Sequence, residues 1–304
     1  MKKRAFTLLE MIFVVVISAV LAIGSFKAFE ALYIRSARAK AITDMTLRSQ
    51  IILDQIGVLL YNRIPNSVIG YTPSGACEAI TELTASRPIL EWLGTMDDEL
   101  LNREYDGFVD MGESNKTSDI LSVPNISTNF SDVNLIFAGA FDEGAEETSK
   151  ACGGAFGWHG NDSNLSYDIS IDSANKEVTL TDDDDHQPDY IYEKFYLTKT
   201  AYAIARGADL TQSDVENNCN YDMTNLRDFN TTLFLFYNYQ PFAGKTFCGD
   251  SGGNRDGNVS ILAEDISSFE AIYVNDSIRI NIDMNKTIRG SDSGVHIYKQ
   301  KVIF

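Results

Sequence analysis

The chain is short of positive charge, of proline and of histidine. Among its 304 residues, 25 are Lys or Arg and 43 are Asp or Glu, so the formal net charge is −18 at pH 7. A surface this acidic repels nucleic acid, which excludes nucleic acid as an expected partner. The first of only six prolines is Pro65, so no proline interrupts a helix before it. The three histidines, His159, His186 and His296, lack the spacing of a zinc site.

Motifs that bind common cofactors are also missing. The sequence has no Walker phosphate loop, no dinucleotide fingerprint and no internal repeat. Hydrophobic residues make up 44% of the chain, which is ordinary for a folded protein. The length suits one sizeable domain, or two small ones, beyond any membrane segment. We therefore expect a folded protein without a cofactor, a calcium site being the one exception considered below.

The N-terminus carries the most specific signal in the sequence. Three cations, Lys2-Lys3-Arg4, precede the small residue Ala5, and an apolar run follows from Phe6 to Phe26. The only charge within that run is Glu10, and a carboxylate inside a membrane helix is rarely present without a partner or a function. An ordinary signal peptide places its small-residue cleavage site after the apolar region. Here the small residue comes first, so cleavage at Ala5 would leave the apolar helix on the mature chain.

This arrangement resembles the class III signal of type IV prepilins and type II secretion pseudopilins. The resemblance implies that prepilin peptidase cuts between Ala5 and Phe6, that Phe6 is methylated, and that Glu10 serves assembly. The family usually has glycine before the cut, where this sequence has Ala5. The resemblance covers about thirty residues. It implies partners of two kinds, prepilin peptidase and other pilins or pseudopilins that pack against the N-terminal helix.

A single long helix is expected to follow the leader. Residues 6–26 can just cross a bilayer, which needs roughly 20 apolar residues. Apolar side chains then recur at spacings of three and four as far as Leu60, which predicts an amphipathic stripe that a β-sheet covers. Gly24 is a weak point in this helix. We predict a leader at 1–5, a helix at 6–64 with a transmembrane part at 6–26, and a β-rich globular region at 65–304.

Positive charge before the transmembrane part favours a cytoplasmic N-terminus. The protein is then expected in the inner membrane, crossing it once, with the bulk of the chain in the periplasm or in a pilus.

Beyond residue 160 the sequence reads as short strands, which predicts an α+β fold with antiparallel sheet packed on the helix. Residues 89–101 are expected to form a short helix, and residues 112–134 a loop. Residues 275–277 carry a hairpin turn signal. The predicted strands are 167–171, 177–180, 190–197, 201–205, 232–237, 261–262, 269–274, 278–282 and 295–304.

All four cysteines, Cys77, Cys152, Cys219 and Cys248, lie beyond the membrane segment. Outside the cytoplasm disulfides persist, and four cysteines allow three pairings. We favour Cys219 with Cys248, which closes a short loop, and therefore Cys77 with Cys152. Free buried thiols are the alternative.

The string GDSGG at 249–253 resembles the nucleophile motif of chymotrypsin-like serine proteases, with Ser251 as the nucleophile. None of the three histidines stands in that family's sequence context, and Asn254 occupies the place of its usual proline. Glycine and aspartate are also ordinary turn residues. A loop is therefore the favoured interpretation, and a serine hydrolase tethered to the membrane is the alternative.

A calcium site is a second hypothesis for the same loop. Asp250, Asn254 and Asp256 offer oxygen ligands on a glycine-rich segment, and residues 182–185 add four carboxylates. Calcium binding by some pseudopilins, which the resemblance brings in, supports the idea. The spacing does not match an EF-hand, and solvated acidic loops are the alternative.

Asn-X-Ser/Thr triplets are unexpectedly frequent, and five of the nine carry an acid two residues before the asparagine. That longer pattern resembles the acceptor of bacterial oligosaccharyltransferases, so we hypothesise N-glycosylation. The five are Asn115, Asn164, Asn230, Asn258 and Asn285; the other four are Asn125, Asn129, Asn161 and Asn275.

The sequence as a whole favours a non-enzymatic minor pseudopilin or minor pilin, expected at the tip of a type II secretion pseudopilus or a type IV pilus. Size and net charge argue against a major subunit, because a homopolymer of so acidic a chain would repel itself. Residues 262–269 resemble the late segment of J-type pseudopilins and W-type minor pilins, whereas Glu10 argues against the K type. A pilus-tip adhesin that uses the acidic loops is a further alternative.

Overall fold

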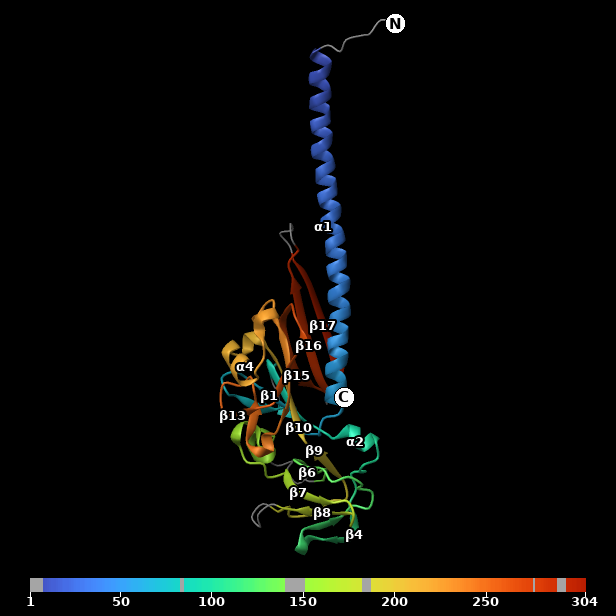
Figure 1. Cartoon of the computed structure of the whole chain (residues 1–304), viewed down its shortest axis with the longest axis vertical. Coiled ribbons are helices and arrows are strands. Elements are labelled where there is room, and N and C mark those ends of the chain that lie inside the picture. The colour runs from blue at the N-terminus through green and yellow to red at the C-terminus, as the bar shows by residue number, and fades with distance from the viewer. Residues whose placement is uncertain (1–7, 83–84, 140–150, 182–186, 276, 289–293) are drawn as a thin grey trace.

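One long helix and a β-rich globular region make up the molecule (Figure 1). The computed structural model describes residues 8–82, 85–139, 151–181, 187–275, 277–288 and 294–304. Helix α1 (Leu8–Tyr61) has 54 residues and is roughly 80 Å long at 1.5 Å per residue. Its first part projects beyond the globular region, and its last part lies against it. The α+β class predicted from the sequence is confirmed.

A stripe of apolar residues explains why the last part of α1 is held. From Ala41 to Tyr61, which we call the packed part, the buried positions recur every three or four residues. At 100° per residue such positions share one face of the helix, as the sequence predicts. Buried on this face are Ala41, Met45, Ser49, Ile52, Leu53, Ile56, Gly57 and Leu60. The helix ends at Tyr61, three residues before the predicted end at residue 64.

A three-stranded antiparallel sheet covers that stripe. It consists of β15 (Ile266–Val274), β16 (Ser277–Lys286) and β17 (Val295–Ile303), in that order. Alternate residues of β16, including Ile278, Ile280 and Ile282, are buried and form one apolar cluster with the helix. Lys301 of β17 reaches across α1, and its Nζ lies 2.7 Å from Asp54 Oδ1. The β15–β16 turn is short, as its sequence predicts, although residue 276 lies outside the described residues.

A six-stranded antiparallel sheet stands next to this unit. Its order is β14-β11-β10-β3-β1-β2. Its strands are β1 (Ile69–Tyr71), β2 (Cys77–Ala79), β3 (Ile89–Gly94), β10 (Thr200–Arg206), β11 (Leu233–Tyr239) and β14 (Asn258–Ala263). Helix α4 (Gln212–Asn218) and the short parallel pair β12 (Lys245–Phe247) and β13 (Asn254–Asp256) lie in the connections.

A second six-stranded antiparallel sheet lies at the end of the molecule farthest from the N-terminus (Figure 1). Its order is β4-β5-β8-β7-β6-β9, and helix α2 (Asp97–Leu101) precedes it in the chain. Its strands are β4 (Asp110–Asn115), β5 (Ile120–Ser122), β6 (Asn134–Phe137), β7 (Tyr167–Asp172), β8 (Glu177–Leu180) and β9 (Phe195–Thr198). It has an apolar cluster of its own, so three clusters stabilise the globular region.

Three local predictions are wrong. Residues 89–94 form strand β3 and only 97–101 are helical, because a fully buried strand and a buried helix segment give the same continuous apolar run. Residues 112–134 include most of β4, all of β5 and the first residue of β6, whose polar residues suggested a loop. The predicted strand at 190–197 begins only at Phe195.

Candidate functional site

The projecting part of α1 is the first candidate site, and here we define it as Leu8–Tyr33. Every side chain of this part is exposed, and its large hydrophobic residues are more than half exposed. The helix is long and apolar enough to cross a membrane by length and composition. The apolar stretch from Leu8 to Phe26 spans roughly 28 Å, close to the thickness of a hydrocarbon core. An apolar surface that the chain does not cover itself is one that lipid or another protein covers.

Glu10 lies in the first turn of this helix and is exposed. A carboxylate suits that place electrostatically, because the first turn of a helix carries partial positive charge. The predicted processing residues Ala5 and Phe6, with the rest of the leader at 1–5, lie outside the described residues.

The second candidate site is a group of charged side chains inside the globular region. Glu91 of β3 is fully buried, and its Oε1 lies 2.8 Å from Nε2 of His159. The other ring nitrogen of His159, Nδ1, lies 3.4 Å from Oδ2 of the buried Asp250. The hydroxyl of Tyr239 donates to the second oxygen of Glu91 at 2.8 Å, and the ring of Tyr71 stacks on the imidazole with centroids 3.8 Å apart. We call these five residues the His159 cluster.

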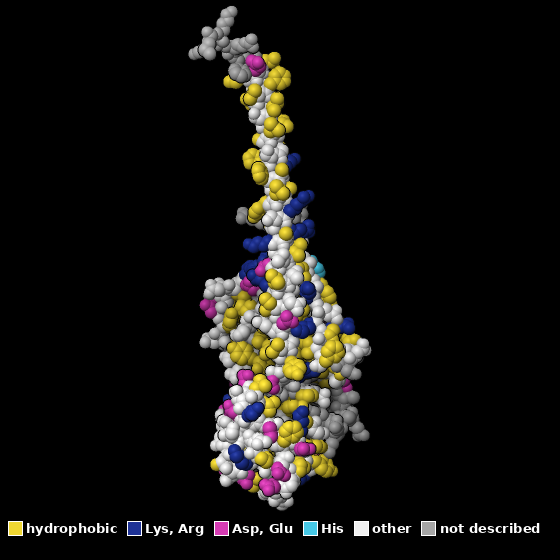
Figure 2. All heavy atoms as spheres, turned by 90° about the vertical axis from the view of Figure 1, so that its right-hand side faces the viewer, with side chains coloured by type: hydrophobic (Ala, Val, Ile, Leu, Met, Phe, Trp, Pro, Cys, Tyr) yellow, Lys and Arg dark blue, Asp and Glu magenta, His cyan; other side chains and the backbone are white. Residues whose placement is uncertain are grey.

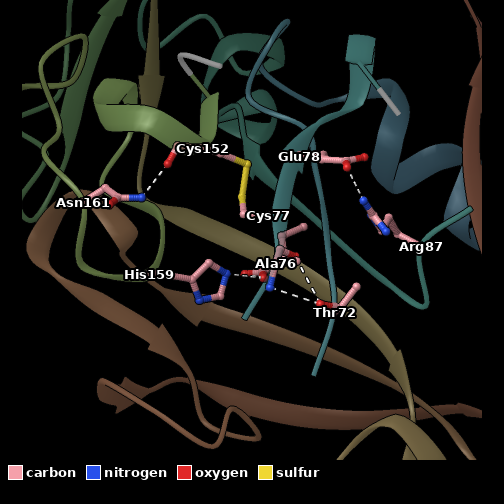
Figure 3. Close-up of a disulfide and its surroundings, with 9 residues drawn as sticks. Thr72, Ala76, Cys77, Glu78, Arg87, Cys152, His159 and Asn161 are labelled. Atoms are coloured by element: carbon pink, nitrogen blue, oxygen red, sulfur yellow. Dashed lines mark hydrogen bonds and ion pairs between the residues drawn. A yellow bond between two sulfur atoms is a disulfide. The ribbon is translucent and has the colours of Figure 1, made fainter. Parts of the chain in front are cut away.

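The loop that presents His159 is held from several sides. His159 has a left-handed backbone with φ of 52°, and Gly157 has φ of 77°. At Gly157 a side chain would collide with the carbonyl of Pro241, so the close approach requires glycine. The disulfide Cys77–Cys152 lies beside this loop, and Asn161 donates to the carbonyl of Cys152 (Figure 3). These contacts fix the imidazole between the two carboxylates.

The electrostatics of the cluster keep the imidazole charged. Burial by itself disfavours the charged form of His159, but Glu91 and Asp250 outweigh it and raise the pKa of the ring to about 10. Burial, together with Asp250 and Glu91, raises the pKa of Tyr71 to about 12. Burial, followed by Glu91, raises the pKa of Tyr239 well above its ordinary value. At neutral pH the cluster is therefore an imidazolium between two carboxylates, together with two neutral phenols.

This geometry does not favour the serine hydrolase hypothesis. Ser251 is exposed, and its backbone N–H donates to Asp250 at 2.7 Å. A general base must be able to accept the proton of the serine hydroxyl. Both nitrogens of His159 face carboxylates, and its raised pKa keeps it protonated. His296 pairs instead with Asp283 on the helix-bound sheet, and His186 lies outside the described residues.

The calcium hypothesis gains no support from the placement of its residues. The carboxylate of Asp250 is buried against His159, whereas Asn254 and Asp256 are exposed on β13. Asp256 accepts the backbone N–H of Gly257 at 2.8 Å. Within the described part of the chain, no group of three His, Cys, Asp or Glu side chains is placed to hold a metal ion. Residues 182–185 lie outside it.

All nine asparagines of the Asn-X-Ser/Thr triplets are exposed, as acceptors of a glycan must be. One of the preceding acids also has a structural role, because Asp228 accepts the backbone N–H of Asn230 at 3.1 Å and caps a short helical turn. Turn chemistry thus accounts for that acid without a glycan. N-glycosylation stays a prediction.

The cysteines pair in the way that we favoured, Cys77 with Cys152 and Cys219 with Cys248. The first disulfide joins β2 to the segment before the His159 loop, and the second joins the end of α4 to the residue after β12. Next to the first disulfide, Glu78 and Arg87 form an ion pair (Figure 3).

Sequence reasoning missed the His159 cluster, although one signal for it was present. Glu91 stands in the apolar run ILEWLG, and a carboxylate among buried strand residues needs a partner. The same argument drew attention to Glu10. The partner itself could not be found in this way, since His159 is 68 residues away.

Comparison with known proteins supports the interpretation of the N-terminus. The family model for the prokaryotic N-terminal methylation motif matches residues 1–26. Searches of curated proteins and of solved structures each find no match to the chain. The matched segment contains the basic leader, Ala5, Phe6 and Glu10, and it continues into the exposed apolar part of α1. The N-terminus of the chain therefore carries the class III signal that is typical of type IV pilins and pseudopilins.

Proposed function

We propose that the protein is a minor, non-enzymatic subunit of a type II secretion pseudopilus or a type IV pilus. The observation that carries the proposal is the projecting part of α1, an apolar helix joined directly to a class III signal and left uncovered by the globular region. Prepilin peptidase would cut between Ala5 and Phe6 and leave Phe6 as the methylated N-terminus. The helix would then pass from lipid to a filament core built from the helices of other subunits.

The packed part of α1 supports assembly through the helix as well. Opposite its buried stripe it exposes a second apolar stripe, made of Leu47, Ile51, Val58 and Tyr61, each at least 56% exposed. Spacings of four, seven and three residues place these side chains on one face. A helix with one stripe for its own sheet and another facing outward is suited to pack between its globular region and a neighbouring helix.

A minor subunit at the filament tip fits the charge and size of the chain. A net charge of −18 on each of many identical neighbours would oppose a homopolymer. The segment 262–269, which resembles J-type pseudopilins and W-type minor pilins, forms the end of β14, a turn and the start of β15. In that turn Glu264 and Asp265 pair with Arg227, so the segment also contributes to the fold.

A periplasmic globular region is supported by two disulfides, which persist outside the cytoplasm, and by the basic leader. A non-enzymatic role is supported by the His159 cluster, since the protonated imidazole cannot serve Ser251 as a base.

Glu10 provides the test of assembly. We propose that its carboxylate pairs with the positive N-terminal amine of a neighbouring subunit, which offsets the burial of both charges and fixes the axial register. Glu10→Leu should reduce incorporation into isolated filaments at least tenfold while the membrane level of the protein is unchanged. The measurement is quantitative immunoblotting of sheared filaments and membranes, with N-terminal mass spectrometry to show methylated Phe6.

Glu30→Leu is the matched control, because Glu30 is the next acid on the same helix and is also exposed. It should leave incorporation near the wild-type level. Normal incorporation of Glu10→Leu would contradict the register role, and an unprocessed N-terminus would contradict the filament function itself.

A further inference from the structure

The segment of α1 between its apolar stretch and the globular region carries a concentration of positive charge. Four exposed cations occur there, and the only acid among them is Glu30. We call them the basic collar; they are Lys27, Arg35, Arg38 and Lys40. Figure 2 shows Lys and Arg side chains gathered along the middle of the helix, between its apolar end and the globular region. The rest of the chain is acidic enough to give −18 overall, so this concentration stands out.

Three members of the collar share one face of the helix. Arg35 follows Lys27 by eight residues and Arg38 follows by three more, which places the three side chains within about 80° of one another at 100° per residue. The same face continues into the buried stripe at Ala41 and Met45. These cations therefore point to the side of the helix on which the globular region lies, while Lys40 points to the opposite side.

If residues 8–26 span the hydrocarbon, the collar begins at the height of the lipid headgroups and extends away from the bilayer. Lys27 then sits at the edge of the hydrocarbon, and Arg35 lies roughly 12 Å farther along the helix. Between them the aromatic residues Phe29 and Tyr33 are 68% and 66% exposed, as interfacial aromatic side chains are. The long side chain of Arg35 and a screening length of about 8 Å at physiological salt bring its charge within reach of the headgroups.

We propose that the basic collar binds the anionic headgroups of phospholipids in the leaflet from which α1 emerges. The proposal requires that α1 crosses a membrane, and it does not depend on filament assembly or on the direction of insertion. The acidic globular region is repelled by the same headgroups. The membrane surface therefore attracts the collar and repels the globular region. Together these forces hold the helix at a fixed depth and keep the globular region away from the bilayer.

The test uses the full chain in nanodiscs made of phosphatidylcholine and phosphatidylglycerol. Electron spin resonance of spin-labelled lipids gives the association of each lipid with the protein. The wild type should favour phosphatidylglycerol over phosphatidylcholine by about threefold or more, since one cation near an anionic surface contributes up to about fivefold. The ratio of phosphatidylglycerol to phosphatidylcholine association should fall toward one in 1 M salt, where electrostatic screening is strong.

A matched pair of variants isolates the collar. K27Q/R35Q/R38Q should bring the lipid preference close to one. K116Q/K194Q/K199Q removes the same amount of charge from exposed lysines of the globular region and should keep the preference of the wild type. Circular dichroism and intact disulfides check that both variants are folded.

Two results would overturn the proposal. The first is that the wild type associates equally with phosphatidylglycerol and phosphatidylcholine. The cations would then pair with an acidic protein surface and not with lipid headgroups. The second is an equal loss of preference in both variants, which would show that only the total charge matters.

Discussion

Two carboxylates interrupt apolar segments of this chain, Glu10 in the projecting part of α1 and Glu91 in β3, and their surroundings differ. Around Glu91, which is fully buried, the chain supplies the partners itself, the partly buried imidazolium of His159 and the buried phenol of Tyr239. Around Glu10 the side chains of the helix are exposed, and they are mostly apolar. The globular region is therefore complete as a folded unit, whereas the projecting part needs a membrane or other subunits to cover it.

The largest expected effect concerns Glu91 and its partners. His159→Gln leaves two buried carboxylates without their cation, and breaking a buried ion pair in this way should lower the free energy of unfolding by about 3–5 kcal/mol at pH 7. Chemical denaturation of the full chain in detergent measures the change. His296→Gln, at a histidine whose side chain is 60% exposed, is the control and should change stability by less than about 1 kcal/mol.

The contribution of His159 to the free energy of unfolding should decrease as the pH rises. The folded pKa of His159, about 10, lies above its unfolded value of 6.5, so its stabilising contribution is complete below pH 6.5 and is lost as pH rises through 10. The free energy of unfolding of the wild type exceeds that of His159→Gln, and this difference should become smaller between pH 6.5 and 10. The decrease should be at most about 1.4 kcal/mol per pH unit. Tyr71 and Tyr239 do not interfere, since burial raises both of their pKa values. A difference that stays constant from pH 6.5 to 10 would contradict a charged imidazole.

A second prediction compares covered and uncovered isoleucines on one helix. Ile56 is fully buried against the sheet, whereas Ile17 is 56% exposed in the projecting part. Ile56→Ala should lower the free energy of unfolding of the globular region by about 2–5 kcal/mol. Ile17→Ala should lower it by less than about 0.5 kcal/mol. Denaturant titration in detergent measures both, and similar losses would mean that the two parts of α1 are not energetically distinct.

The sequence predicts the local features of this molecule and misses the non-local ones. The course of α1, its buried stripe and the later strands follow from the spacing of apolar residues within one segment. Strand β3 was mistaken for helix because its six residues are all buried, and burial on both faces removes the alternation that marks a strand.

The two candidate sites also differ in this respect, because one is local in the sequence and the other is not. The class III signal is contiguous in sequence, so a role for Glu10 could be predicted without a structure. The His159 cluster joins Glu91, His159 and Asp250 across three segments of the chain, and only the fold brings them together. The spacing of these residues in the sequence does not predict such an arrangement.

The smallest expected effect tests whether the projecting part is energetically separate from the globular region. Gly24 lies in the helix interior, and a methyl group added there would meet nothing within 4 Å. Gly24→Ala should stabilise the helix locally by about 1 kcal/mol and slow hydrogen exchange of the neighbouring amides about fivefold in detergent. The free energy of unfolding of the globular region should not change.

Gly57→Ala, in the packed part, is the matched substitution. Its new methyl group would lie 2.8 Å from Nζ of Lys301, which must then move away from Asp54. The gain in helix propensity is offset there by the lost contact, and exchange should change in β17 as well as in α1, because the two elements pack together. If Gly24→Ala also altered exchange in β17, the projecting part would be coupled to the sheet, and the proposed separation between an uncovered helix and a self-sufficient globular region would be wrong.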